Sequence, residues 1–133
     1  MPALGFKRQF VDYVLDGSKL HSIRALRKRP FAAGDTLSLY YGMRTKQCRL
    51  LFRAPCIKVE EFRMVRARVW IDGEELCRDE KDALAWRDGF RFKDTGRAGC
   101  FELMLAFWVK THGDIDFSGQ IIHWDFDKRE VAA

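Results

Sequence analysis

Alternation of polar and apolar residues in two separate stretches, 36–71 and 117–126, constrains the fold of this chain most strongly. Side chains at every second position of a strand share one face, so an alternating stretch can bury one face only. Thr36–Tyr41 shows this pattern clearly, and the Asp72-Gly73 pair is typical of a two-residue hairpin turn. We expect strands that pair in one bent sheet at residues 36–41, 48–52, 57–64, 66–71 and 117–126.

Apolar residues at helical spacing predict three helices beside this sheet. The first spans Arg8–Leu15 and ends at Gly17, because glycine adopts a left-handed backbone at little cost. Pro55 has no N–H to donate, so we expect an edge or a bulge between the strands on either side of it. The fold class is α+β, a bent sheet or pseudo-barrel with flanking helices, which include Asp79–Trp86 and Arg97–Lys110.

Length and composition are typical of a single packed domain over residues 1–133. Hydrophobic residues make up 47% of the chain, and no apolar run approaches the roughly 20 residues that span a bilayer. Residues 1–8 lack the apolar core of a signal peptide, so we expect a cytoplasmic location and no membrane partner. The cysteines are too widely spaced for a zinc site, and we expect no metal, no cofactor and mostly buried, reduced thiols at Cys48, Cys56, Cys77 and Cys100.

Charge is divided unevenly along the chain. Residues 1–68 contain 15 Lys and Arg against 5 Asp and Glu, a balance of +10, whereas residues 69–133 have a balance of −5. Such a division favours a basic face that attracts polyanions. The alternative is that the two halves interleave in space and the surface is mixed.

The segment Gly17–Arg24 concentrates reactive side chains in a few positions. Lys19, His21, Ser22 and Arg24 lie within six residues, and three further cations follow at Arg27, Lys28 and Arg29. A hydroxyl with a neighbouring lysine can support nucleophilic hydrolysis, and a basic run can bind phosphates. The structural alternatives are a solvated cation that contacts phosphate for Lys19 and a turn-capping hydroxyl for Ser22.

The same segment resembles the signature of the ASCH domains, which are similar to the PUA-type RNA-binding barrels. That signature is Gly-x-Lys-x-x-Ser/Thr-x-Arg after a helix, followed by Gly-Asp before a strand. In this chain it occupies Gly17–Arg24 and Gly34-Asp35. Residues 39–46, Asp88-Gly89-Phe90, residues 111–113 and residues 117–122 also look like the family, most closely its small stand-alone versions from bacteria and their phages.

The resemblance implies RNA binding, and it implies hydrolysis in two branches of the family. In the branch that removes the acetyl group from acetylcytidine, a lysine, a threonine and a glutamate work together. These positions fall on Lys19, Ser22 and Asp88, so serine replaces threonine and the shorter aspartate replaces glutamate. The structural alternative for Asp88 is a solvated carboxylate at a helix end. Another branch has been described as a ribonuclease, and here Lys19, His21 and Arg24 would hold the phosphate.

We therefore expect a basic cleft that binds RNA, a nucleotide or a modified nucleoside. Either tyrosine of the Tyr40-Tyr41 pair offers a ring on which a base can stack. The candidate nucleic-acid-binding residues are His21, Arg24, Arg27, Lys28, Arg29, Tyr40, Arg44 and Lys46. The alternatives are an amidohydrolase acting through Ser22, Lys19 and Asp88, a ribonuclease, and an interaction protein of a phage or mobile element with a vestigial cleft.

Overall fold

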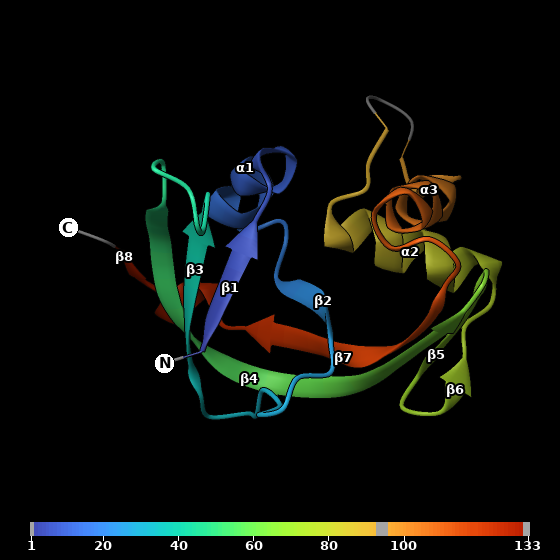
Figure 1. Ribbon diagram of the computed structural model, residues 1–133, viewed down its shortest axis with the longest axis horizontal. Coiled ribbons are helices and arrows are strands. Elements are labelled where there is room, and N and C mark those ends of the chain that lie inside the picture. Colours follow the sequence, from blue (N-terminus) through green and yellow to red (C-terminus); the bar gives the residue numbers. More distant parts are fainter. Residues whose placement is uncertain (1, 93–95, 132–133) are drawn as a thin grey trace. The chain divides into compact units, whose positions relative to one another are not determined.

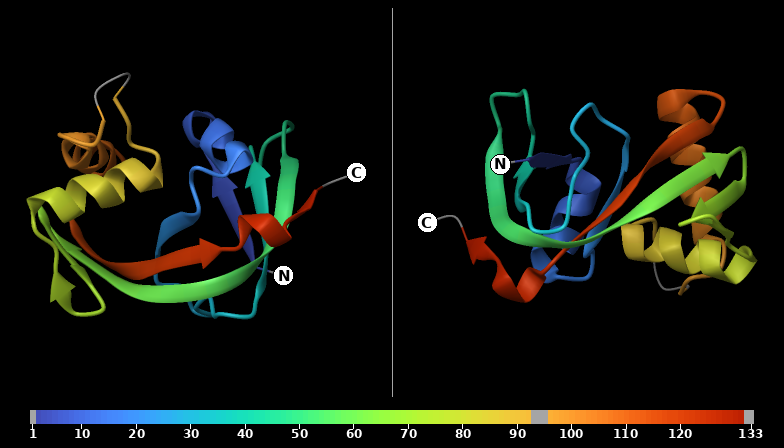
Figure 2. Two further views of the ribbon diagram at one scale, coloured as in Figure 1. Left: turned by 180° about the vertical axis from the view of Figure 1, so that it is seen from behind. Right: turned by 90° about the horizontal axis from the view of Figure 1, so that it is seen from below.

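The structure is a computed structural model that describes residues 2–92 and 96–131. These residues divide into two compact units, each made of separate stretches of the chain. Unit 1 comprises Met1–Ser22, Arg29–Val59 and Ile122–Ala133, and unit 2 comprises Ile23–Lys28 and Glu60–Ile121. Figure 1 labels the elements of both units, and Figure 2 shows two further views. The single ASCH domain expected over 1–133 stays a prediction.

The α+β fold class is confirmed. Hydrogen bonds connect the strands of the described residues in the order β1-β3-β4-β5-β6, with β2 beside β7, β7 also beside β4, and β8 beside β4. This order has free ends at β1 and β6, so these strands form an open mixed sheet and not a closed barrel. The similarity to a PUA-type pseudo-barrel stays a prediction.

Unit 1 is built around three strands and one helix. Strand β1 (Ala3–Phe6) runs parallel to β3 (Thr36–Tyr41), which pairs antiparallel with the first part of β4 (Arg49–Val65). The short β8 (Glu130–Val131) also pairs with β4, after the 3-10 helix η1 (Phe126–Lys128). The core of this unit contains the fully buried side chains Leu4, Val11, Val14, Leu37, Leu39 and Phe52.

Helix α1 (Arg8–Asp16) confirms the helix predicted from the apolar stripe. Phe10, Val11 and Val14 are its buried residues, as helical spacing requires. Gly17 ends the helix with a left-handed backbone, at φ 82°. A Cβ at Gly17 would also lie 2.8 Å from Cε2 of Phe126, so glycine is needed there for space as well as conformation.

Unit 2 combines a hairpin with two helices that pack together, α2 (Arg78–Asp88) and α3 (Cys100–His112). The end of β4 pairs with β5 (Arg68–Ile71), which pairs with β6 (Glu74–Glu75). Asp72 and Gly73 both have positive φ, so the predicted two-residue turn is confirmed. Asp82 of α2 accepts a hydrogen bond from the N–H of Phe101, which fixes the start of α3 against α2.

Aromatic side chains fill the core of unit 2. The ring centroids of Phe62 and Trp108 are 5.6 Å apart, and those of Trp108 and Phe117 are 5.0 Å apart. Phe117 comes from β7 (Asp116–Trp124), whose last three residues belong to unit 1. Strand β2 (His21–Ala25) likewise begins in unit 1 and ends in unit 2.

Two expectations from the sequence are wrong in detail. Pro55 does not separate two strands, because β4 runs without interruption from Arg49 to Val65. Pro55 pairs with Thr36, the first residue of β3, so its missing N–H falls where that ladder ends. The cysteines are not mostly buried, since two are exposed and two are buried, and all four are free thiols: Cys48, Cys77, Cys56 and Cys100.

Candidate functional site

Hydrogen bonds from backbone groups hold the segment that follows α1, and part of this segment is buried in unit 1. The N–H of Lys19 donates to the carbonyl of Tyr13 at 3.0 Å, and the N–H of Ser18 donates to Oδ1 of Asp16 at 2.8 Å. The carbonyl of Leu20 accepts from the N–H of Trp124 at 3.1 Å. These bonds fix the chain on both sides of Lys19, so its position is set by the fold.

Lys19 is buried, with only 2% of its surface exposed. Its Nζ lies 5.9 Å from the ring centroid of Phe6 and 5.3 Å from that of Phe10, distances at which an ammonium is attracted to an aromatic face. Lysine is almost never buried without compensating interactions, because charge is costly to remove from water. The alternative of a solvated surface cation at Lys19 is therefore wrong.

Two histidines that are 102 residues apart in the sequence meet in unit 1. His21, on β2, is 4% exposed, and its ring centroid lies 5.4 Å from that of half-buried His123 on β7. Ser22, the next residue of β2, is 5% exposed. His123 was not among the candidates from the sequence, and its only signal there was that the chain has just three histidines.

Arg24 and Asp88 both belong to unit 2. Asp88 is the last residue of α2 and is 6% exposed, so it is not an ordinary solvated carboxylate. Burial lowers the pKa of Arg24, and the negative charge of Asp88 opposes that shift. Lys19 and Ser22 lie in unit 1, so a cleft common to Lys19, Ser22, Arg24 and Asp88 stays a prediction.

The basic run lies in the connection between β2 and β3, where Arg27, Lys28 and Arg29 are all exposed. The Gly34-Asp35 part of the motif secures the end of this connection to β4. The N–H of Gly34 donates to the carbonyl of Cys56, and the N–H of Cys56 donates to the carbonyl of Asp35. The Gly-Asp pair therefore has a structural role, whereas the three cations face solvent.

The remaining candidate cations of unit 1 lie at the other end of β3. Arg44 and Lys46 are exposed in the turn after this strand, and Arg29 is in the connection before it (Figure 1). A six-residue strand is about 17 Å long, so the two loops begin at well-separated points. Half-buried Tyr40 lies between them on β3, paired with Gly5 and Leu50.

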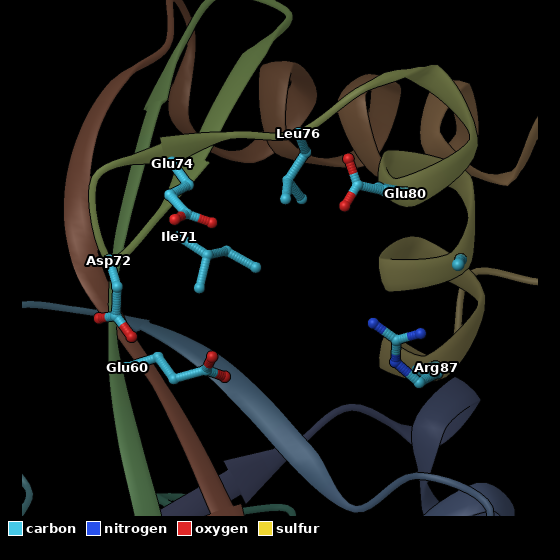
Figure 3. A pocket seen from close by; sticks show the side chains of 8 residues that line it. Glu60, Ile71, Asp72, Glu74, Leu76, Glu80 and Arg87 are labelled. Carbon is cyan, nitrogen blue, oxygen red and sulfur yellow. The ribbon is translucent and has the colours of Figure 1, made fainter.

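A groove in unit 2 was not predicted from the sequence (Figure 3). It has a volume of about 570 Å³ and lies between the β5–β6 hairpin and α2. Glu60, Asp72 and Glu74 present carboxylates on the hairpin side, and Arg87 and Glu80 face them from α2. The apolar part of the lining consists of Ile71, Leu76 and Ala83.

Two of the groove carboxylates also stabilise the local backbone. Oδ1 of Asp72 accepts the N–H of Glu61 at 2.8 Å, and Oε1 of Glu80 accepts the N–H of Cys77 at 2.9 Å. The bond from Cys77 lowers the pKa of Glu80, so this carboxylate is ionised at neutral pH. Within residues 2–92 and 96–131, no group of three or more His, Cys, Asp or Glu side chains has the arrangement of a metal site.

None of the helices in the described part of the chain is both long enough and apolar enough to cross a membrane. Comparison of the chain with protein-family models, with curated proteins and with solved structures found no match. The ASCH resemblance therefore remains a prediction that rests on residues Gly17–Arg24, Gly34-Asp35 and the later segments that accompany them.

Proposed function

We propose that this chain is an RNA- or nucleotide-binding domain of the ASCH type, with its ligand held by the segment Lys19–Arg24 and the loop Arg27–Arg29. One observation carries the proposal. Lys19, His21 and Ser22 are buried within four consecutive positions, and a run of three exposed cations begins five residues after Ser22. Lysine, histidine and serine side chains are seldom buried so close together, and such a cluster favours a functional role.

The segment Lys19–Arg24 and the loop Arg27–Arg29 suit different tasks in binding. Exposed arginines and lysines contact phosphates and position a polyanion without reading its sequence. Buried side chains such as His21 and Ser22 can hydrogen-bond one nucleotide in a defined orientation. The proposal therefore assigns general attraction to Arg27, Lys28 and Arg29, and selectivity to the residues from Lys19 to Ser22.

The proposal extends to a PUA-like fold and a cytoplasmic location. Supporting the fold is the order of elements, in which α1 ends at Gly17 and the Gly34-Asp35 pair fixes the entry to β3. Supporting the location are the four free thiols, since disulfides are rare in the cytoplasm.

The proposal is tested by the salt dependence of binding to a short single-stranded RNA, measured by fluorescence anisotropy. We expect the wild-type chain to bind, and the logarithm of the affinity to fall linearly with the logarithm of the salt concentration. The triple variant Arg27→Ala, Lys28→Ala, Arg29→Ala should bind more weakly. Its slope should be shallower by about 0.7 for each phosphate that the variant no longer neutralises, or about 2 if all three cations bind phosphates.

A matched control removes three exposed cations elsewhere: Arg78→Ala, Lys110→Ala and Lys128→Ala. This control changes the net charge by the same amount, so long-range attraction falls equally in both variants. The proposal predicts that the control retains most of the wild-type slope. Equal slopes for wild type and loop variant would show that the loop is only a solvated surface.

A second candidate function is hydrolysis of an acylated cytidine, and the burial of Ser22, Lys19 and Asp88 favours it. Ser22 would attack the acyl carbon while Lys19 accepts its proton, since a lysine shielded from water can act as a base. Lys19 would pass this proton to the cytidine nitrogen as the bond between that nitrogen and the acyl carbon breaks, and water would then hydrolyse the acyl-serine ester to release acetate. The test is release of acetate from N4-acetylcytidine. Loss of release in Ser22→Ala, with nucleoside binding retained, supports this candidate, and absence of release by the wild-type chain refutes it.

The ribonuclease alternative gains one specific observation, the contact between His21 and His123. Two neighbouring imidazoles can serve as general base and general acid at neutral pH. Electrophoresis of labelled RNA after incubation distinguishes this activity from binding alone. Cleavage that is lost in His123→Gln but retained in His112→Gln supports it, because His112 is exposed on α3. Intact RNA after incubation with the wild-type chain contradicts it.

A further inference from the structure

The groove of unit 2 combines charge with an apolar surface. Four carboxylates and one guanidinium line it, so it has a net negative charge beside the side chains of Ile71 and Leu76 (Figure 3). Its volume of about 570 Å³ is in the range of pockets that hold ligands or anchoring side chains. The groove is therefore complementary to a segment that carries both positive charge and an apolar side chain.

This chain itself contains such a segment. Leu26 is 56% exposed, which is high for a large apolar residue, and the exposed cations Arg27, Lys28 and Arg29 follow it directly. Leu26 is complementary to the apolar part of the groove lining, and the three cations that follow it are complementary to the carboxylates that border this lining. The segment belongs to residues 1–68, whose charge balance is +10, and three of the four groove carboxylates belong to residues 69–133, whose balance is −5.

We infer that a second copy of this chain docks its Leu26–Arg29 segment into the acidic groove of the first. Leu26 covers the apolar lining, and the cations lie against the carboxylates of Glu60 and Glu74. Each copy has one segment and one groove, so a closed pair can exchange both contacts. A contact made by one four-residue segment is small, and interfaces below about 1,200 Å² are typically weak and transient, so we expect a reversible association that salt weakens.

The association has a consequence for binding, which rests on the proposed function. RNA and the groove would both bind the cations of the loop Arg27–Arg29. Occupancy of the loop by RNA therefore excludes self-association, and self-association at high protein concentration weakens RNA binding. This is regulation of the proposed site by the concentration of the chain itself.

Sedimentation equilibrium of the full chain without RNA tests the inference at roughly 10 to 500 µM, the range suited to weak contacts. At low salt we expect the average mass to rise above the monomer mass of 15.6 kDa as concentration increases, and to return toward it at high salt. A mass that stays at 15.6 kDa across the whole range at low salt overturns the inference.

Charge reversal identifies the two surfaces. The loop variant Lys28→Glu, Arg29→Glu and the groove variant Glu60→Lys, Glu74→Lys should each stay monomeric by themselves. An equimolar mixture should associate, because the acidic loop of one variant meets the basic groove of the other. The control Asp114→Lys changes an exposed acid outside the groove and should associate like wild type. Failure of the mixture to associate, with both variants folded by circular dichroism, overturns the inference.

Addition of a short single-stranded RNA completes the experiment. If RNA binds, the mass of the wild-type protein component should fall toward that of one copy as RNA is added. Self-association that persists at saturating RNA overturns the competition. If RNA does not bind at all, the proposed function fails, while the measurements made without RNA still decide whether the copies associate.

Discussion

Replacement of Gly119 by alanine should disturb the pairing of β2 with β7 and displace Arg24. Gly119 is a buried residue of β7 with an ordinary strand backbone, so its importance comes from space and not from conformation. A Cβ built at Gly119 would lie 2.2 Å from the carbonyl oxygen of Arg24 and 2.7 Å from Cε1 of Phe117. The first of these atoms is backbone, so it can move away only if the strand itself moves.

The size of the effect follows from this overlap. An oxygen and a methyl carbon normally stay more than about 3 Å apart, so β2 must shift by about 1 Å, and overpacking of this kind costs about 1–3 kcal/mol or more. Unfolding entropy is about 2.1 cal/mol/K per residue, or about 0.28 kcal/mol/K for 133 residues. We therefore expect Gly119→Ala to lower the Tm by about 4–11 °C, measured by calorimetry.

The matched control is Gly5→Ala on β1, which also has an ordinary strand backbone. Its added Cβ would lie 2.9 Å from Sδ of Met43, the flexible end of a side chain that can turn away. We expect this variant to lose less than about 1 kcal/mol. A Tm for Gly119→Ala equal to wild type, or a larger loss in the control, would refute the close approach of β7 to Arg24.

Three further predictions test other parts of the molecule. Lys19→Met keeps an unbranched side chain of similar length and removes the charge, so the fold should be retained. In an anisotropy titration, the affinity for RNA should fall at least about tenfold. An unchanged affinity would show that Lys19 does not belong to the RNA-binding site. The hydrogen bond from Arg68 lowers the pKa of Glu75, so the stabilising effect of this pair is present at neutral pH and is lost in acid, as Glu75 becomes protonated. The Tm difference between wild type and Arg68→Ala should disappear in acid, and a difference that grows there would contradict the pairing. Cys56 and Cys100 are buried, and burial raises the pKa of the Cys56 thiol. A thiol reagent should therefore modify the exposed Cys48 and Cys77 of the folded chain quickly, and Cys56 and Cys100 only on unfolding. Four equally fast thiols would contradict the burial of Cys56 and Cys100.

Local patterns predicted most of the elements but not all of their limits. The stripe around Phe10 and Val14, the stop at Gly17 and the turn at Asp72-Gly73 depend on neighbouring residues, and the structure confirms all three. Pro55 misled the prediction because a proline is harmless at the end of a ladder, and the position of that end depends on the partner strand. Strand β1 was missed because four residues are too few for a periodic signal, and its partner β3 is more than 30 residues away.

In the candidate site, too, neighbouring residues could be predicted to belong together, whereas contacts with distant residues could not. The spacing of Lys19, His21 and Ser22 drew attention to the segment, but only the fold shows that these side chains are buried. The neighbour of His21 could not be predicted, since His123 lies on β7 and reaches it through tertiary packing. The acidic groove was also missed, because its residues come from β4, the β5–β6 hairpin and α2, and each is unremarkable in its own segment.

Hydrogen exchange of the wild-type chain, with and without a short single-stranded RNA, shows which segments the RNA covers. We expect slower exchange in peptides that cover residues 17–29 when RNA is bound, and unchanged exchange in α3, where Val109 and Lys110 are exposed. Absence of any RNA-dependent change, or protection confined to α3, would contradict binding through the Lys19–Arg24 segment and the Arg27–Arg29 loop.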